Sequence, residues 1–248
     1  MFKDLFSSQA ATYSEIRPDY PLALYDFVCG LVEPRRTAWD CATGSGQAAT
    51  ALTQYFDHVI ATDASAEQIK HARPHPKVEY RVATAEQSGL ASASVQLVTV
   101  AQALHWFDRD RFYDEARRVL VPNGVIAVWS YGDPIILEAP TLDAALQQFN
   151  KGTLGAYWPT DRGLVGSHYR ELPFPFEEIS APALVIERQW TLTELAQYAR
   201  TWSSRTRYVA QHSVDPVSAF EASLEELWGG PAARHLVRWP LTVRVGKS

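Results

Sequence analysis

Cysteine is scarce in this sequence, which has only Cys29 and Cys41 among its 248 residues. Two cysteines cannot supply the disulfide framework of a small secreted protein, so we expect two buried thiols in a reducing compartment. Long apolar runs are also missing, because no window approaches the roughly 18 residues of a membrane-spanning helix. The amino terminus carries no apolar signal core. These absences predict a cytoplasmic protein without a membrane partner.

Basic residues are too few and too dispersed to form a nucleic-acid-binding surface. Lys and Arg number 23 against 28 Asp and Glu, which gives a formal net charge of −5. Phosphate backbones are held by clustered Lys and Arg, so we predict no nucleic-acid partner. The 7 histidines show no ligand spacing with Cys, Asp or Glu, and we therefore predict no metal. The composition does not indicate an oligomeric state.

What the sequence does contain is a regular alternation of short β-rich and helical segments. Strands are expected at 37–42, 58–62, 78–82, 95–100, 125–129, 185–192 and 241–245. An amphipathic helix is expected at 109–120, and two helices between the last two strands, the second with an apolar face of Phe220, Leu224, Leu227 and Trp228. Alternation of this kind is typical of a doubly wound α/β fold. We therefore predict a mostly parallel, seven-stranded Rossmann-like sheet with helices on both faces, in a single domain spanning 1–248.

A glycine-containing turn follows the first predicted strand, in the segment Asp40–Gln47. Gly44 and Gly46 would let the backbone turn tightly and approach a ligand at the amino end of the next helix. Ligands of doubly wound sheets bind beyond the carboxyl ends of the strands. Asp63 ends the second strand at that edge, where its carboxylate would accept hydrogen bonds from ribose hydroxyls. The pattern predicts a cofactor that contains a ribose.

Two cofactors fit this turn, and their charges separate them. The residues from Gly44 to Ala49 satisfy a Gly-x-Gly-x-x-Ala dinucleotide fingerprint, which leaves an NAD-linked oxidoreductase open. Asp40, however, would repel a pyrophosphate and attract the ammonium of a methionyl group. We also find no recognisable hydride-transfer set after the fourth predicted strand. These points favour S-adenosylmethionine.

The segment Asp40-x-Ala42-x-Gly44-x-Gly46 resembles the first motif of class I S-adenosylmethionine-dependent methyltransferases, whose usual form has Gly at the position of Ala42. The segments Thr62–Ser65, Ala83–Glu86 and Val100–Phe107 are similar to the stretches that border the ribose, the adenine and the sulfonium. The resemblance implies that the following residues bind S-adenosylmethionine: Asp40, Ala42, Gly44, Gly46, Asp63, Ala64, Ala85, Glu86 and Gln102.

The residues before the sheet are similar to the lid of the trans-aconitate methyltransferase-like branch (methyltransferase type 11). The resemblance implies that Tyr13 and Arg17 close the site, with Arg17 beside the carboxylate of the cofactor. The alternative is one face of a surface helix. The expected organisation is a helical lid at 1–32, a cofactor-binding core at 37–131, a substrate-side insertion at 133–176, and closing strands and helices at 177–248.

Two further residues are candidates for catalysis of methyl transfer. The reaction is an in-line displacement, so the protein has mainly to align the nucleophile and exclude water. His105 would act as a base for a phenol or amine acceptor, and its alternative is a packed ring beside Trp106. Arg205 would clamp an acceptor that is already a carboxylate, and its alternative is a solvated helix face. The branch resemblance favours a small-molecule acceptor, with a carboxylate as one candidate. A non-catalytic S-adenosylmethionine-binding module stays open.

Overall fold

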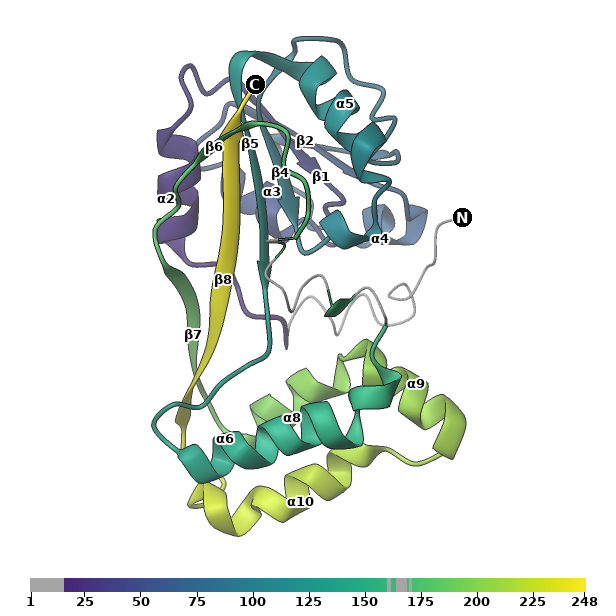
Figure 1. The fold of residues 1–248 in the computed structure, drawn as a ribbon, viewed down its shortest axis with the longest axis vertical. Coiled ribbons are helices and arrows are strands. Elements are labelled where there is room, and N and C mark those ends of the chain that lie inside the picture. The colour runs from purple at the N-terminus through teal and green to yellow at the C-terminus, as the bar shows by residue number, and fades with distance from the viewer. Residues whose placement is uncertain (1–15, 160–161, 164–168, 170) are drawn as a thin grey trace.

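A twisted sheet forms the centre of the molecule in the computed structural model (Figure 1), which describes residues 16–159, 162–163, 169 and 171–248. Within these residues the sheet has eight strands in the order β3-β2-β1-β4-β5-β8-β6, and β7 also pairs with β8. The five strands from β1 to β5 are parallel, whereas β8 is antiparallel to β5, β6 and β7. The strands are β1 (Thr37–Cys41), β2 (His58–Asp63), β3 (Val78–Val82), β4 (Val95–Ala101), β5 (Leu120–Tyr131), β6 (Glu177–Ile179), β7 (Leu184–Trp190) and β8 (His235–Lys247).

The mostly parallel α/β sheet is confirmed, but the predicted number of strands differs by one. β6 and β7 pair with consecutive stretches of β8, from Lys247 to Val245 and from Leu241 to His235. The four residues between them include Pro182, which has no backbone N–H to donate to a strand ladder. The sequence analysis missed β6, which precedes this interruption.

Helices cover both faces of the sheet, because successive strand side chains point to opposite faces. Leu97 and Ala127 pack with α2 (Leu22–Gly30) and α3 (Gln47–Leu52), whereas Val98 and Val128 pack with α5 (Arg109–Val119). α5 matches the helix predicted at 109–120, and α4 is a short helix at Ala66–Lys70. The two cysteines are buried free thiols, as predicted.

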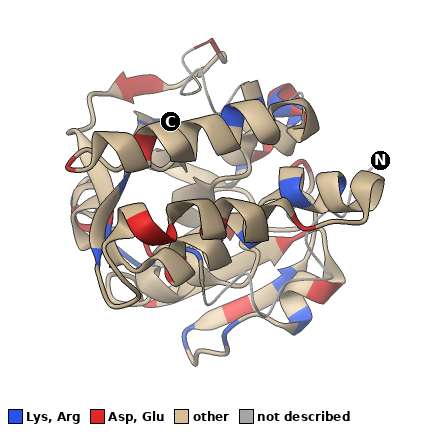
Figure 2. Cartoon of the chain, turned by 90° about the horizontal axis from the view of Figure 1, so that it is seen from below, with Lys and Arg blue, Asp and Glu red and all other residues tan. Residues whose placement is uncertain are grey.

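A layer of helices lies at the end of the molecule where the parallel strands terminate (Figure 1), and we call it the helical layer. It contains α6 (Pro140–Gln147), α8 (Leu192–Arg200), α9 (Ser203–His212) and α10 (Pro216–Trp228), with a π-helical stretch at Gln148–Thr153 and a 3-10 turn at Gly155–Tyr157. Figure 2 shows acidic and basic positions interspersed along this end. None of the described helices is long and apolar enough to cross a membrane.

The helical layer corrects two details of the sequence analysis. Three helices, not two, lie between β7 and β8, because Trp202, between the end of α8 and the start of α9, has an extended backbone. In α10 the side chains of Phe220, Leu224 and Trp228 are buried, but Leu227 is 54% exposed. The predicted apolar face was therefore too wide by one residue.

Candidate active site

The carboxyl ends of β1, β2, β3 and β4 meet at one edge of the sheet, below the glycine-containing turn. Three residues of that turn have a left-handed backbone, with φ of 55° at Ala42, 56° at Gly44 and 82° at Gly46. Gly46 precedes α3, and a Cβ there would lie 2.2 Å from the hydroxyl oxygen of Tyr80. Tyr80 in turn donates a hydrogen bond to the Arg73 carbonyl at 2.7 Å. Only glycine fits between α3 and β3 without moving this side chain.

Ala42 is the non-glycine residue of this turn that has a left-handed backbone, a conformation that a Cβ atom disfavours. A left-handed conformation costs an L-residue about 1 kcal/mol relative to glycine. We expect Ala42→Gly to raise the free energy of unfolding by about 1 kcal/mol, measured by urea denaturation. The matched control is Ala48→Gly inside α3, which should lower the same quantity by about 1 kcal/mol. An Ala42→Gly protein no more stable than the wild type would contradict the assignment of strain.

Asp63 joins the ends of β1 and β2. One carboxylate oxygen accepts a hydrogen bond from the Gly44 N–H at 2.9 Å, and the other accepts from the Ser65 N–H at 2.9 Å. Ser65 caps α4 by accepting from the Gln68 N–H, which fits the capping spacing of the sequence. Ala64, between these groups, is half-buried. A carboxylate has about four acceptor positions, and the two amides occupy two of those of Asp63.

Asp40 is almost completely buried, unlike a residue that faces a ligand. It is 1% exposed, and its carboxylate accepts hydrogen bonds from the hydroxyls of Thr43 at 2.6 Å and Thr99 at 2.7 Å. Burial raises the pKa of Asp40 to about 6, although these two hydroxyls favour the ionised form. The carboxylate thus fixes the start of the turn against β4, and its direct attraction for a cofactor ammonium stays a prediction.

Gln102 and Arg17 both contact Tyr131, the last residue of β5. Gln102 has a left-handed backbone with φ of 57°, and its side-chain amide donates to the Tyr131 carbonyl at 3.2 Å. Arg17 donates to the Tyr131 hydroxyl at 3.1 Å, and its guanidinium lies 5.2 Å from the ring centroid of Tyr198. The structure therefore brings both residues to the predicted edge. Tyr13 lies outside the described residues.

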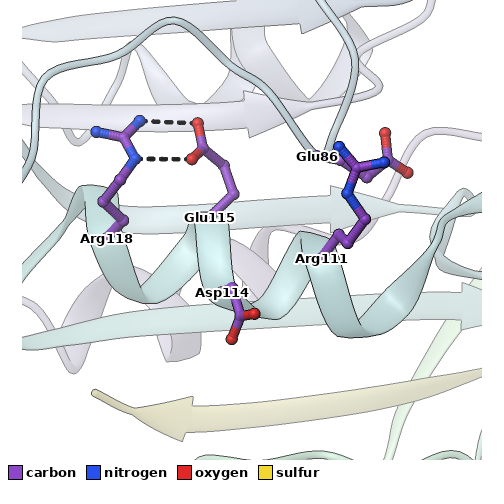
Figure 3. A pocket seen from close by; sticks show the side chains of 5 residues that line it. All are labelled: Glu86, Arg111, Asp114, Glu115 and Arg118. Carbon is purple, nitrogen blue, oxygen red and sulfur yellow. Dashed lines mark hydrogen bonds and ion pairs between the residues drawn. The ribbon is translucent and has the colours of Figure 1, made fainter.

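Ala85 and Glu86 follow β3 in a loop that runs along α5. Ala85 is buried in the core, and Glu86 accepts a hydrogen bond from the Asp108 N–H at 3.0 Å. Figure 3 shows Glu86 at one side of a shallow pocket between this loop and α5, whose other lining residues are Arg111, Asp114, Glu115 and Arg118. The sequence analysis did not single out this charged group, because its members belong to two separate segments.

His105 lies in a 3-10 turn after β4 and contacts Tyr169. The His105 Nδ1 is 2.8 Å from the Tyr169 hydroxyl oxygen, and the His105 ring lies 4.6 Å from Trp106. Burial raises the pKa of Tyr169 well above its ordinary value, so the phenol keeps its proton at neutral pH. Sequence reasoning missed Tyr169 as the partner of His105, since 64 residues separate them.

Arg205 occupies a different environment from the one expected for an acceptor clamp. Its guanidinium forms a two-pronged ion pair with Asp215, at 3.1 Å and 2.7 Å. Asp215 also accepts from the Val217 N–H at the start of α10. The contacts of Arg205 are those of a link between α9 and α10, rather than the solvated face that was its alternative.

Arg162 is a cation that the sequence analysis missed. It pairs with Asp133, which follows β5, and its guanidinium lies 3.5 Å from the ring centroid of Trp158. Both Arg17 and Arg162 lower the pKa of the buried Tyr198, whose burial nevertheless raises it overall. Both guanidinium groups are therefore close enough to Tyr198 to affect its ionisation. Among the residues that the structure describes, no group of three or more His, Cys, Asp or Glu could hold a metal ion.

Comparisons with known proteins agree with this geometry. A family model described as "Methyltransferase domain" matches residues 39–128, which span β1 to β5. A Dictyostelium discoideum protein named a methyltransferase is 32% identical over 225 residues, covering 90% of this chain and 86% of its own. A Saccharomyces cerevisiae protein named an S-adenosylmethionine-dependent methyltransferase is 28% identical over 141 residues, or 53% of this chain and 48% of its own.

A solved structure gives the same result over nearly the whole fold. The protein is described as a type II methyltransferase from Anaeromyxobacter dehalogenans, and it superposes with a TM-score of 0.87 and 41% sequence identity. The match covers 93% of this chain and 97% of that one. The chain belongs to the class I S-adenosylmethionine-dependent methyltransferases.

Proposed function

We propose that this chain binds S-adenosylmethionine at the carboxyl edge of β1 to β4 and transfers the methyl group to a small molecule. The proposal rests above all on Asp63, whose carboxylate lies at the carboxyl end of β2 and joins the glycine-containing turn at Gly44 to the start of α4 at Ser65. In this proposal residues 37–131 hold the cofactor. Residues 133–176 and the helices of 177–248 form the acceptor side.

The residues at this edge fit the chemistry of the cofactor. Gly44 and Gly46 expose backbone beside the start of α3. Asp40 supplies negative charge near the place of the methionyl ammonium, and the loop containing Ala85 and Glu86 flanks the place of the adenine. Bound there, the cofactor would supply a methyl group on a sulfonium, a good leaving group for direct displacement.

The residues of the protein have to position the methyl acceptor and, where the acceptor carries a proton, remove it. His105 can act as a base through Nε2 only when Nδ1 carries the ring proton and donates it to the Tyr169 oxygen. In that arrangement Tyr169 holds the ring orientation. A carboxylate acceptor needs no base, and His105 would then only border the methyl group.

For a carboxylate acceptor, Arg17 and Arg162 are better placed than Arg205. Arg205 donates through Nε and Nη2 to both oxygens of Asp215, whereas Arg162 donates to Asp133 through Nη2 alone. Arg17 lies over the Tyr198 ring and donates to Tyr131 at the end of β5. A planar guanidinium over an aromatic ring presents its N–H edge to a carboxylate. We therefore move the proposed clamp from Arg205 to this pair.

The test is a calorimetric titration of the protein with S-adenosylmethionine, S-adenosylhomocysteine and NAD. Micromolar-range binding of both adenosyl ligands, without binding of NAD, is the expected result. Binding of NAD alone would replace the proposal by an oxidoreductase. A homocysteine-release assay with small carboxylates, phenols and amines then identifies the acceptor class. Binding without release on any acceptor would favour a non-catalytic module.

A further inference from the structure

Residues 83–94 connect β3 to β4, and we call them the adenine-side loop. The loop begins beside Asp63, because the Ala83 N–H donates to the Asp63 carbonyl at 3.0 Å. Most of its residues are exposed or half-buried, with Ala85, Ser88 and Leu90 as the buried ones. A loop with so little buried surface needs other contacts to hold one conformation.

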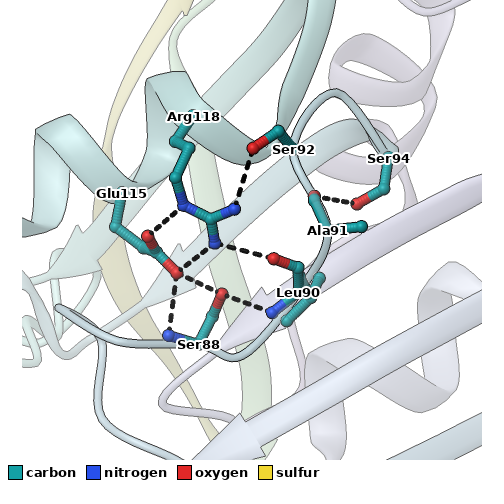
Figure 4. Close-up of polar contacts among 7 residues, drawn as sticks. All are labelled: Ser88, Leu90, Ala91, Ser92, Ser94, Glu115 and Arg118. Atoms are coloured by element: carbon teal, nitrogen blue, oxygen red, sulfur yellow. Dashed lines mark hydrogen bonds and ion pairs between the residues drawn. The ribbon is translucent and has the colours of Figure 1, made fainter.

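Those contacts come from Glu115, a buried residue in the middle of α5. One of its carboxylate oxygens accepts hydrogen bonds from the Ser88 N–H at 2.9 Å and from the Ser88 hydroxyl at 2.5 Å (Figure 4). The Ser88 oxygen accepts in turn from the Leu90 N–H at 3.1 Å. Ser88 lies only two residues after Glu86, so this contact fixes the loop close to the proposed ligand.

Arg118, one helical turn after Glu115, holds the second half of the loop. Its guanidinium donates to both oxygens of Glu115, at 2.7 Å and 2.8 Å, and to the Leu90 carbonyl at 2.7 Å (Figure 4). A fourth bond from this guanidinium reaches the Ser92 hydroxyl at 3.1 Å. The backbone continues the contact, because the Ala93 N–H donates to the Arg118 carbonyl at 2.9 Å.

We propose that Glu115 and Arg118 are positioning residues for cofactor binding, which hold the adenine-side loop against α5 without touching the ligand. The inference rests on the proposed function, since the loop matters only if Ala85 and Glu86 border the adenine. α5 is anchored in the core through Phe112, Ala116 and Val119, whereas most residues of the loop are exposed or half-buried. Loss of the ion pair would therefore free the loop rather than move the helix.

The charge of the pair is stable over the pH range in which the protein would be assayed. The Arg118 guanidinium is the largest influence on Glu115 and lowers the pKa of its carboxyl to about 2. The carboxyl is thus ionised at neutral pH and keeps accepting from Ser88 and Arg118.

The test compares Glu115→Gln with the wild type by calorimetric titration. Two probes are used: S-adenosylmethionine, and 5′-methylthioadenosine, which has the adenine and ribose without the methionyl end. We expect the dissociation constants of both probes to rise by about fivefold, because the change acts on the adenine side. The matched control is Glu178→Gln, which breaks another two-pronged ion pair, with Arg244, in the β6–β8 part of the sheet. It should leave both constants unchanged.

A second variant separates the loss of the loop contact from a general folding defect. Ser88→Ala keeps the ion pair and removes only the serine hydroxyl, and we expect about a twofold to threefold rise for both probes. Unchanged affinity in a folded Glu115→Gln protein, or an equal loss in Glu178→Gln, would overturn the inference alone. Absence of binding by the wild type would instead overturn the proposed function, and the inference with it.

Discussion

Replacing Asp63 by alanine is expected to weaken the binding of S-adenosylmethionine and S-adenosylhomocysteine about a hundredfold. The carboxylate accepts from the Gly44 and Ser65 amides, and in the proposed complex it also accepts from the ribose. Hydrogen bonds to a charged group contribute about 1.5–3 kcal/mol each, and a hundredfold loss corresponds to about 2.7 kcal/mol. Calorimetry on both ligands measures the change.

Two other variants separate loss of the ligand contact from loss of the fold. Asp63→Asn keeps one oxygen acceptor, so we expect an intermediate loss of about tenfold. Asp57→Ala, at the opposite end of β2, removes an exposed carboxylate and should leave affinity unchanged. A folded Asp63→Ala protein that binds both ligands as tightly as the wild type would remove the main support for the proposed site.

The affinity for S-adenosylmethionine is expected to fall about tenfold between pH 8 and pH 5, through Asp40. Burial raises the pKa of this carboxyl from 3.8 to about 6. The methionyl ammonium favours the ionised carboxylate, so binding below pH 6 must first remove a proton. At pH 5 only about a tenth of the carboxyl is ionised, which sets the size of the effect.

The raised pKa of Asp40 has the opposite effect on the stability of the fold, which decreases as the pH rises. The unfolded chain loses this proton near its ordinary pKa of 3.8, before the folded chain does near 6. Stability from Asp40 therefore decreases as pH rises from about 4 to about 6, by about 3 kcal/mol in all. Asp40→Asn should reduce both trends, giving weaker binding that changes less with pH and a smaller loss of stability over that window.

Calorimetry in two buffers of different ionisation enthalpy measures these proton exchanges directly. The wild type should release protons on binding S-adenosylmethionine at pH 5.5, and the Asp40→Asn variant should release fewer. Equal proton release by the two proteins would show that another group, not Asp40, responds to the ligand.

Features that depend on local pattern could be predicted from the sequence. Leu97 and Val98 lie on opposite faces of the strand predicted at 95–100, because side-chain direction in a strand has a period of two. Strand ends placed Asp40 and Asp63 at one edge, because parallel strands terminate together. The turn residues were also recognisable, since glycine marks positions of left-handed backbone.

Features that depend on tertiary docking could not be predicted. Ser88 and Glu115 are 27 residues apart, and nothing in either segment specifies the other. Arg205 was a candidate to bind the acceptor, but in the fold it forms an ion pair with Asp215 at the start of α10. Arg162 and Trp158 lie in a segment with little periodicity, so only the fold shows that they approach the end of β5.

The position of β8 has a consequence for the way the protein is made. β8 lies between β5 and the two strands β6 and β7, yet it follows all of them along the chain. Until β8 pairs, the outer edge of β5 presents backbone groups without a partner strand. About a hundred residues separate β5 from β8, and synthesis at roughly 5–20 residues per second leaves this edge open for roughly 5–20 seconds. The nascent chain is therefore expected to be prone to aggregation at this stage unless a chaperone covers the edge.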